Sequence, residues 1–379
     1  MKVNKLKYLI DFIKIKKAMI NKSHFFFFPF YHIGGAERVH LDILEVFDKK
    51  NSICFITNNS MNNYFYEEFK SKTTLIEIEK LTPKYKQKLI NLIVKHINKK
   101  NKSLVFGCNS HLFYDLIPNF KDTVKIIDLI HAFSYEEPYA AEKYSLPVVE
   151  KINNRIILGK KTFFDFEKLY FENDIHSKNL DQIKIIKNKV EVPEQFLAKP
   201  YNKNLKILFV GRNSSEKRPE IFFEIAKKCL DLKLSVEFTV IGDFDLNLNA
   251  SQNVSIIGLI HDKSLLNDYY QNSDLLLITS SREGFPMVVL EGMAHGVVPI
   301  CTNVGEISEF INSENQNGFI ISNNQEVENI VQDFVKQIET LENNGNILSS
   351  TSLNAYQSVK SNFSITQFSE SYKKLLKNK

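Results

Sequence analysis

The chain has 379 residues, 43% of them apolar and 25% charged, and this composition is typical of a soluble globular protein with two domains. A formal net charge of +5 is too small for a protein that binds nucleic acid mainly through its charge. The four cysteines lie far apart, which argues against a disulfide framework or a zinc site of closely spaced ligands and favours free thiols in a reducing compartment.

The first 23 residues carry seven lysines and a single acidic residue, Asp11. Apolar residues recur among them at helical spacing, which predicts a basic amphipathic helix. These residues are Leu6, Leu9, Ile10, Ile13 and Ile20. Two interpretations stay open: shallow contact of this segment with an anionic membrane, or a helix packed on its own domain with a solvated lysine face.

Membrane-spanning and secretory segments are not evident in the chain. It contains no run of about 20 apolar residues and no pattern of a cleavable signal peptide. We therefore expect a cytoplasmic protein, either free or peripheral at the inner face of the cytoplasmic membrane.

The first half opens with an apolar run at residues 24–28, a glycine turn at Gly34 and Gly35, and a helical pattern from residue 36 to about 47. Helical patterns also occupy residues 84–98 and 160–171. Further strands are expected at residues 52–57, 75–78, 104–106, 124–130, 155–158 and 183–186. These runs lack strict alternation, as expected for parallel strands that helices cover on both faces.

The second half repeats the pattern, with an apolar run at residues 206–210, Gly211, a polar loop and a helix at about 219–230. More strands are expected at residues 236–241, 254–257, 274–279, 297–301 and 319–321. Helical patterns occupy residues 265–271, 326–341 and 363–376. Strand, turn and helix in this order predict a parallel α/β sheet.

The predicted fold class is therefore α/β, with two Rossmann-like parallel-sheet domains that face a central cleft. The boundary is placed in the polar stretch 190–204, which contains Pro193 and Pro200. We expect a first Rossmann-like domain at 1–195, a second at 196–355, and a C-terminal helix at 356–379 that packs back on the first domain.

The strongest chemical signal is the segment Ser281-Arg-Glu-Gly-Phe-Pro-Met-Val-Val-Leu-Glu291. It follows a predicted strand, Pro286 suits the first turn of a helix, and Gly296 suits its end. Glu283 then stands at the edge of the sheet where open α/β sheets bind ligands. The free N–H groups of the helix start suit a phosphate, and each carboxylate can accept bonds from a pair of sugar hydroxyls. Alternatively, Glu283 and Glu291 are solvated helix-end acids.

A second signal is Gly211-Arg-Asn-Ser-Ser-Glu-Lys217, which also follows a strand. Arg212 and Lys217 can bracket a diphosphate and neutralise a departing nucleoside diphosphate. The alternative is an ordinary polar loop.

The first half contributes Gly34 and Gly35, whose backbone can approach a ligand and adopt unusual dihedral angles. His131, at the end of a strand, can donate to a sugar hydroxyl or act as an acid or base. Alternatively, it is a structural histidine that is hydrogen-bonded in the wall of the cleft. The dinucleotide pattern G-x-G-x-x-G is absent from the sequence, which counts against NAD or FAD. Asp243 and Asp245 lack a third ligand nearby in sequence, so they are interpreted as turn residues rather than a Mg²⁺ site.

Together these motifs resemble glycosyltransferase family 4, the retaining GT-B enzymes. Glu283 and Glu291 match the Glu-x7-Glu element, and Gly211, Arg212 and Lys217 match the Gly-Arg-x4-Lys loop. Residues 34–39 look like the glycine loop of the family. Glu306 and Lys189 depart from it, since glycine is common at both positions, and either departure could alter the sugar pocket or the hinge.

The resemblance implies that Glu291 binds the ribose, Glu283 the donor sugar, and Arg212 and Lys217 the diphosphate. It implies that Gly35 lies close to the diphosphate and that His131 lies beside the sugar. The implied catalytic residues are Glu283, His131, Arg212 and Lys217. The implied donor site also includes Gly34, Gly211, Ile257, Gly258, Gly284, Phe285, Met287 and Val288.

The sequence thus predicts a retaining glycosyltransferase without cofactor or required metal. Its donor would be a UDP- or GDP-sugar, with UDP favoured, and its acceptor a glycan or lipid-linked saccharide of the cell envelope. Nucleic acid is not an expected partner. The alternatives are a sugar-nucleotide epimerase or phosphorylase on the same fold, or a non-catalytic nucleotide-sugar-binding scaffold. The presence of both carboxylates and both cations favours the enzyme.

Overall fold

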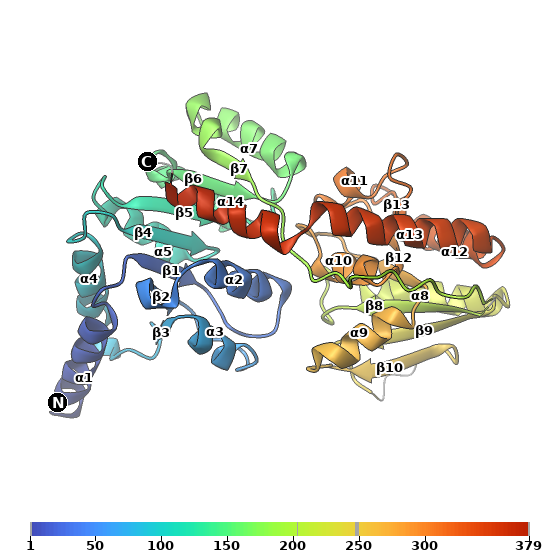
Figure 1. Ribbon diagram of the computed structural model, residues 1–379, viewed down its shortest axis with the longest axis horizontal. Helices are drawn as coiled ribbons and strands as arrows, with labels where there is room; N and C mark the ends of the chain where they lie inside the picture. The colour runs from blue at the N-terminus through green and yellow to red at the C-terminus, as the bar shows by residue number, and fades with distance from the viewer. Residues whose placement is uncertain (1, 203, 247–249, 378–379) are drawn as a thin grey trace. The chain divides into compact units, whose positions relative to one another are not determined.

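A computed structural model describes residues 2–202, 204–246 and 250–377 (Figure 1). Residue 1 of the predicted basic segment and residues 378–379 of the predicted C-terminal helix lie outside the described residues. The chain divides into two compact units, one of Met1–Lys187 with Phe368–Lys379 and one of Asn188–Gln367. Each unit is a parallel α/β sheet covered by helices, as predicted.

The first unit holds a seven-stranded sheet in the order β3-β2-β1-β4-β5-β6-β7, and the pairs described are parallel. The strands are β1 (His24–Phe28), β2 (Ser52–Ile56), β3 (Thr74–Glu77), β4 (Leu104–Cys108), β5 (Lys125–Leu129), β6 (Asn154–Ile157) and β7 (Ile183–Ile185). The principal helices are α1 (Lys2–Ala18), α2 (Gly35–Val46), α3 (Tyr66–Lys72), α4 (Lys86–Ile97), α5 (His111–Leu116), α6 (Ala141–Tyr144), α7 (Lys160–Glu172) and α14 (Ile365–Lys377).

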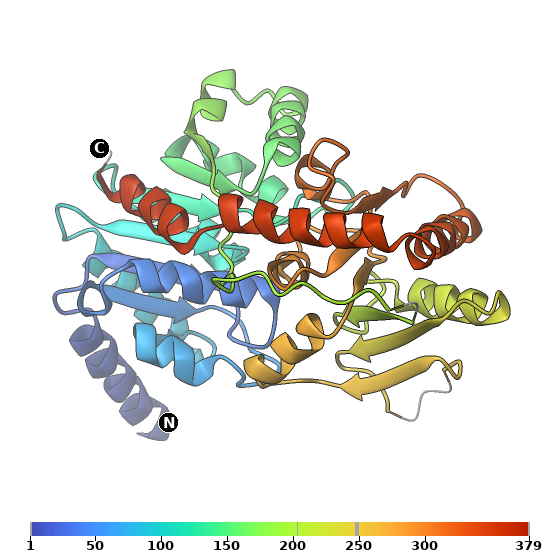
Figure 2. The same ribbon diagram turned by 45° about the vertical axis from the view of Figure 1, so that its right-hand side comes forward.

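Aromatic side chains fill both faces of this sheet. Phe25 and Phe27 of β1 point into one core with residues of α4 and α5, while Phe26 and Phe28 point to the other face. Helices α2 and α14 lie on that other face (Figure 2), where Phe26 contacts Phe47 and Phe106 contacts Tyr372. A strand buried on both faces needs no polar alternation, which explains the continuous apolar runs.

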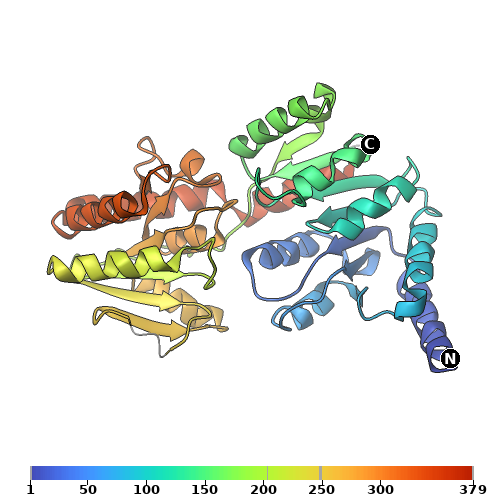
Figure 3. The ribbon, with the colours of Figure 1, turned by 180° about the vertical axis from the view of Figure 1, so that it is seen from behind.

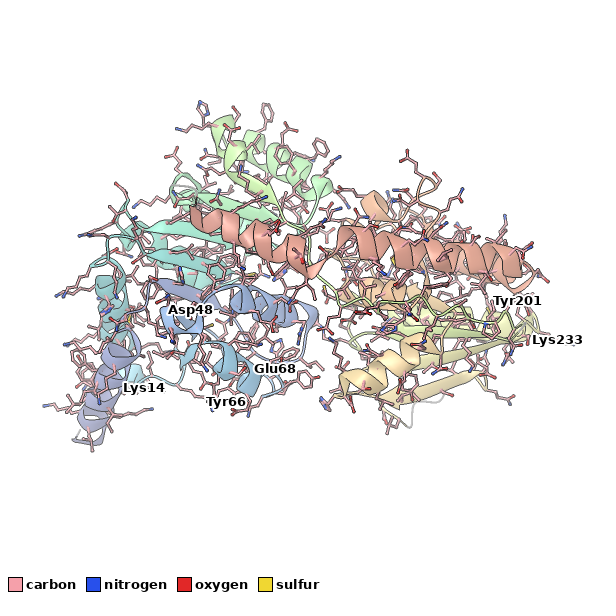
Figure 4. The ribbon with its side chains drawn as sticks, in the orientation of Figure 1. Lys14, Asp48, Tyr66, Glu68, Tyr201 and Lys233 are labelled. Atoms are coloured by element: carbon pink, nitrogen blue, oxygen red, sulfur yellow. The ribbon has the colours of Figure 1, made fainter. Side chains whose placement is uncertain are left out.

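Helix α1 does not pack through the apolar residues singled out in the sequence. Ile15 and Met19 are fully buried in the core instead, and Asp11 accepts hydrogen bonds from the N–H and hydroxyl of Thr82 at 2.9 and 2.6 Å. The predicted apolar residues stay exposed, at 62% for Leu6, 51% for Leu9, 56% for Ile10, 44% for Ile13 and 58% for Ile20. Lys14, labelled in Figure 4, is exposed on the same helix.

The second unit holds a six-stranded sheet in the order β10-β9-β8-β11-β12-β13, and the pairs described are parallel. The strands are β8 (Leu205–Val210), β9 (Val236–Ile241), β10 (Val254–Gly258), β11 (Leu275–Ile278), β12 (Val298–Thr302) and β13 (Phe319–Ile321). The helices are α8 (Pro219–Asp231), α9 (Lys263–Gln271), α10 (Met287–Ala294), α11 (Ile307–Phe310), α12 (Val327–Glu342) and α13 (Gly345–Asn362).

Two apolar cores sandwich this sheet. Helices α8 and α12 bury their apolar faces against one side, and α9, α10 and α13 cover the other. Figure 3, seen from behind, shows α8 in front of the strands. The strand predictions are confirmed within two residues at each end.

Two predicted domain limits are wrong. The second unit begins at Asn188 rather than 196, because Val190 donates a backbone hydrogen bond to Phe363 at 3.2 Å and packs in the core of that unit. The expected C-terminal element at 356–379 is also not one helix. Its first part belongs to α13, where Tyr356 donates to the carbonyl of Pro193 at 2.7 Å, and only residues from Phe368 onward join the first unit.

Among the residues described here, no helix is both long enough and apolar enough to cross a lipid bilayer.

Candidate functional site

The topology of the second unit marks one point of its sheet. The chain leaves β8 toward β9 and β10 on one side and then returns to β11, β12 and β13 on the other. Open α/β sheets bind ligands at such a switch point, beyond the carboxyl ends of the strands. The loops after β8 and β11 carry the predicted residues Arg212, Lys217 and Glu283, so the structure places these residues on adjacent loops at the switch point.

Lys217 and Glu283 form an ion pair across the switch point. Lys217 Nζ lies 2.5 Å from Glu283 Oε1, and the side chains are 19% and 10% exposed. The hydroxyl of Ser280 donates to the same carboxylate oxygen at 2.7 Å. Two donors therefore hold Glu283 in place, and a sparingly solvated charge pair is stronger than one fully exposed to water.

The two loops are also joined through their backbones. The hydroxyl of Thr279 donates to the carbonyl of Lys217 at 2.9 Å, and the N–H of Ser281 donates to the carbonyl of Glu216 at 2.8 Å. Arg218 Nε donates to the carbonyl of Thr279 at 2.6 Å. Arg218 and Thr279 were not predicted, yet they fix the positions of Lys217 and Glu283, which limits the rearrangement a ligand would require.

Arg212 is exposed and pairs with Glu216, with Nη2 2.7 Å from Oε1. Next to it, the N–H of Asn213 donates to Asp243 Oδ1 at 2.6 Å, so Asp243 stabilises the turn. Gly242 has a φ of +157°, and a Cβ there would lie 1.9 Å from the carbonyl oxygen of Gly211. The loop after β8 therefore requires a glycine in the neighbouring loop, since only glycine leaves that space open.

Glu291 lies on α10, close to the second turn of the helix. The hydroxyl of Tyr270 on α9 donates to Glu291 Oε2 at 3.0 Å. Burial, and then the charge of Glu291, raises the pKa of Tyr270 well above its usual range, so the phenol stays protonated. Tyr270 escaped the sequence analysis because its contact with Glu291 joins two different helices.

The ends of α10 differ in how well they were predicted. Pro286 precedes the helix as its N-cap, in an extended conformation, rather than lying in its first turn, and it supplies no side-chain cap. The other end is confirmed. Gly296 has a φ of +68°, and the N–H groups of Gly296 and Val297 donate to Met293 and Gly292, which is the Schellman arrangement. The uncapped start leaves N–H groups available for an anion.

Gly305, after β12, contacts the backbone of the loop that carries Glu283. Its φ is +54°, and a Cβ there would lie 2.1 Å from the carbonyl oxygen of Gly284 and 2.2 Å from that of Glu283. The N–H of Glu306 donates to the Gly284 carbonyl at 2.9 Å. Glu306, a departure from the family pattern, is thus part of the backbone support for Glu283.

The remaining predicted donor residues of this unit lie further along the same edge. Phe285, Met287 and Val288 are partly buried and pack against the apolar core of the unit. Ile257 is 37% exposed, and Gly258 ends the edge strand β10 with a φ of +81°. Strand β9 separates this pair from β8, so the structure places them beside the switch point rather than within it.

Gly34, Gly35 and His131 belong to the first unit. Gly34 is the N-cap of α2 with a φ of 174°, which is extended backbone, and Gly35 is not among the described glycines with positive φ. The expectation of unusual dihedral angles is therefore wrong. The helix start has no side-chain cap, but the Glu37 carboxylate lies against it, with Oε2 2.2 Å from where a Cβ of residue 34 would be.

His131 contacts a second histidine that the sequence analysis missed. Its Nε2 lies 3.1 Å from Nε2 of His40 on α2, and His40 stacks on Phe28. Burial lowers the pKa of His131 to about 4 and, together with His131, lowers that of His40 well below its usual range. Both imidazoles are thus neutral near pH 7, and one donates to the other.

Residues 193–358 match the family model of glycosyl transferases group 1. Over this stretch the chain is similar to group 1 glycosyl transferases. The match spans most of the second unit, including the loops of Lys217, Glu283 and Gly305, whereas Gly34, Gly35 and His131 lie outside it.

Similar glycosyltransferases extend over most of the chain. A Campylobacter jejuni protein named GalNAc-α-(1→4)-GalNAc-α-(1→3)-diNAcBac-PP-undecaprenol α-1,4-N-acetyl-D-galactosaminyltransferase is 21% identical over 90% of this chain and 95% of its own. The Staphylococcus aureus capsular polysaccharide biosynthesis glycosyltransferase CapH is 23% identical over 73% and 80%. Anabaena HepE, solved in complex with UDP and with UDP-glucose, superposes with a TM-score of 0.74 in the UDP complex at 15% identity, over 94% of this chain and 99% of its own. The chain thus shares the two-domain GT-B fold.

Proposed function

We propose that this protein is a retaining glycosyltransferase that transfers a sugar from a UDP-sugar, in preference to a GDP-sugar, to a glycan or lipid-linked saccharide in cell-envelope polysaccharide synthesis. The observation that carries the proposal is the ion pair of Lys217 with Glu283 across the switch point of the second sheet, 2.5 Å long. A cation and a carboxylate held together at this edge offer one group to a diphosphate and one to a sugar.

The charges of the second unit suit a nucleotide-sugar donor. Arg212, exposed beside Lys217, and Lys217 itself would neutralise the diphosphate as it leaves. Glu283 would accept hydrogen bonds from the sugar hydroxyls. Glu291, oriented by Tyr270, would accept bonds from the ribose hydroxyls. Two fixed cations supply the neutralisation that a metal ion provides in other enzymes, so we propose transfer without a metal.

In the proposed reaction, the bond between the anomeric carbon and the phosphate oxygen breaks, and a bond to the acceptor oxygen forms on the same face of the sugar. The proton of the acceptor hydroxyl passes to the leaving phosphate. Lys217 and Arg212 lower the barrier because negative charge grows on that phosphate. Gly35 and His131 are proposed to serve the same donor, His131 through a neutral imidazole that donates to a sugar hydroxyl.

The relatives support the donor and the pathway. HepE binds UDP and UDP-glucose, the Campylobacter relative is named for an undecaprenol-linked acceptor, and CapH is named for capsular polysaccharide. We therefore propose a cytoplasmic reaction on an envelope precursor.

The first test is thermal unfolding of the wild type and of Glu291→Ala with UDP, GDP, ADP and their common sugar conjugates in the presence of EDTA. A nucleotide at a hundred times its dissociation constant adds roughly 2.7 kcal/mol of stability. We expect a UDP-dependent rise for the wild type, its loss in Glu291→Ala, and the full rise in Glu339→Ala, an exposed carboxylate on α12.

Other outcomes distinguish the alternatives. Stabilisation without release of nucleotide from any donor in the presence of acceptor lipid extracts would indicate a binding scaffold. Conversion of the donor without an acceptor would indicate an epimerase. No stabilisation by any nucleotide would overturn the proposal.

We further propose that α1 rests on an anionic membrane surface where a lipid-linked acceptor lies. The exposed apolar residues Leu6, Leu9, Ile10 and Ile13 alternate with exposed lysines on this helix. Apolar burial together with electrostatic attraction is the usual basis of such binding. The packed residues Ile15 and Met19 make deletion of the segment a poor test, because deletion would also remove part of the core.

Point substitutions avoid this difficulty. Ile10→Asn with Ile13→Asn should reduce sedimentation with phosphatidylglycerol vesicles, while Ile347→Asn, an equally exposed isoleucine (43%) of the second unit, should not. Equal sedimentation of all three proteins would exclude α1 as the contact.

A further inference from the structure

Three residues far apart in sequence meet in the first unit. His40 lies on α2, Cys108 is the last residue of β4, and His131 follows β5. The ligating atoms of the two imidazoles and the thiol all lie within 4.8 Å of one another. His40 and Cys108 are fully buried, whereas His131 is partly exposed and gives the cluster an approach from solvent.

The cluster lies at the switch point of the first sheet. Strand β1 is flanked by β2 and β4, so the chain reverses its direction of travel between β1 and β4, where open sheets bind ligands. Cys108 ends one of these two strands, and His40 belongs to the helix that follows the other. The position is therefore one at which the fold itself favours a bound group.

The spacing fits a tetrahedral metal ion. Two zinc–nitrogen bonds of normal length at the tetrahedral angle separate their nitrogens by about 3.3 Å. The Nε2 atoms of His40 and His131 are already 3.1 Å apart. Tetrahedral ligation places nitrogen and sulfur about 3.6 Å apart, and the sulfur lies within 4.8 Å of both nitrogens, so a shift of at most about 1 Å completes the site. Imidazole and thiolate together are ligands that zinc prefers over magnesium or calcium.

The three groups can ligate in the protonation states that a metal requires. A coordinating thiol loses its proton to the metal, and a neutral imidazole ligates through its unprotonated nitrogen.

We propose that His40, Cys108 and His131 form a zinc site, with two Nε2 atoms and one Sγ as ligands and a fourth position open toward solvent. On binding, the proton shared by the two Nε2 atoms moves to an Nδ1 atom, and the thiol proton of Cys108 leaves to water. The site is independent of the proposed function. Zinc would inhibit sugar transfer if His131 also binds the donor sugar. This consequence rests on the proposed function, whereas the zinc site itself does not.

The experiment uses Co²⁺ as a spectroscopic probe on the purified full chain, first treated with EDTA and then freed of it. We expect one Co²⁺ per chain, visible bands of tetrahedral geometry, and a sulfur-to-cobalt charge-transfer band, all displaced by Zn²⁺. Cys108→Ser should lose the sulfur band, and His40→Gln should weaken binding at least about tenfold. Cys229→Ser, a buried thiol of the second unit, should leave the spectrum unchanged.

Circular dichroism of each variant in EDTA checks that it is folded. A folded wild type without a sulfur band, or a band that persists in Cys108→Ser, overturns the site, and His131→Gln provides a second ligand variant if His40→Gln does not fold. These readouts are optical and need no donor, so failure of the zinc site leaves the glycosyltransferase proposal unaffected.

Discussion

In both units the first strand is flanked by the second on one side and by a later strand on the other, β1 by β2 and β4, and β8 by β9 and β11. The second unit fills its switch point with charged side chains on polar loops, led by Lys217 and Glu283. The first fills its own with neutral, buried groups, led by His40 and Cys108. Topology fixes where a ligand can bind in each unit, while the loops decide its chemistry.

The largest effect should come from the charged switch point. Lys217→Ala removes the cation that pairs with Glu283 and, by our proposal, with the leaving phosphate, so kcat should fall by about 10²–10³-fold. Steady-state kinetics with a saturating UDP-sugar measure this. Lys227→Ala, an exposed lysine of α8, is the matched control. Equal activity of the two variants would show that the second unit does not act through this pair.

The backbone support of the same loop should give the next largest effect. Gly305→Ala places a Cβ against the carbonyls of Gly284 and Glu283 at a φ of +54°, so it should destabilise the second unit by about 1–3 kcal/mol and weaken donor binding. Urea unfolding and nucleotide titration measure the two effects. Asn303→Ala, exposed in the same loop, should change neither. If Gly305→Ala had the stability and nucleotide affinity of the wild type, the Glu283 loop would be able to move away from the added Cβ without cost.

The histidines at the switch point of the first unit should make the stability of that unit depend on pH. Unfolded histidines take up protons near pH 6.5, whereas folded His131 stays neutral down to its pKa of about 4, and His40 behaves in the same direction. Stability is therefore full above pH 6.5 and declines as pH falls toward 4, and His131 alone accounts for about 1 kcal/mol of this loss between pH 7 and 5.5.

Thermal unfolding in EDTA at these two pH values measures the loss. The double variant His40→Gln with His131→Gln should lose less stability on acidification than the wild type, and His261→Gln, an exposed histidine, should lose as much as the wild type. An identical loss of stability in all three proteins would show that His40 and His131 are not held neutral in the folded state. The two switch points would then differ less in charge than the structure indicates.

Much of the fold follows from local pattern, because strands buried on both faces are continuous apolar runs and the turns between them contain glycine. Helix α13 was not predicted, since its many Ser and Asn residues are poor helix formers. Its stability comes from packing of Ala355 and Val359 in the core beside α10, which is a tertiary effect. Short helices such as α5 and α6 carry too few residues for a periodic signal.

The candidate site was predictable only as far as single loops. Glu283 and Lys217 were assigned to the same sheet edge because each follows a strand, but their direct pairing depends on β8 and β11 being neighbours. Tyr270 and Cys108 gave no local signal. Tyr270 reaches Glu291 from another helix, and the nearest ligand partner of Cys108 lies 23 positions away, at His131. Such contacts come from topology rather than spacing.

The return of α14 to the first unit sets an order of events on the ribosome. Phe368 and Tyr372 are buried, Tyr372 lies against Phe106, and Lys125 donates to the backbone carbonyl of Leu375. Synthesis runs from the N-terminus, so every residue of the second unit has emerged before this last piece of the first. Of the two units, the one that starts first is completed last, and the apolar surface around Phe106 stays uncovered until α14 has been synthesised after the whole second unit.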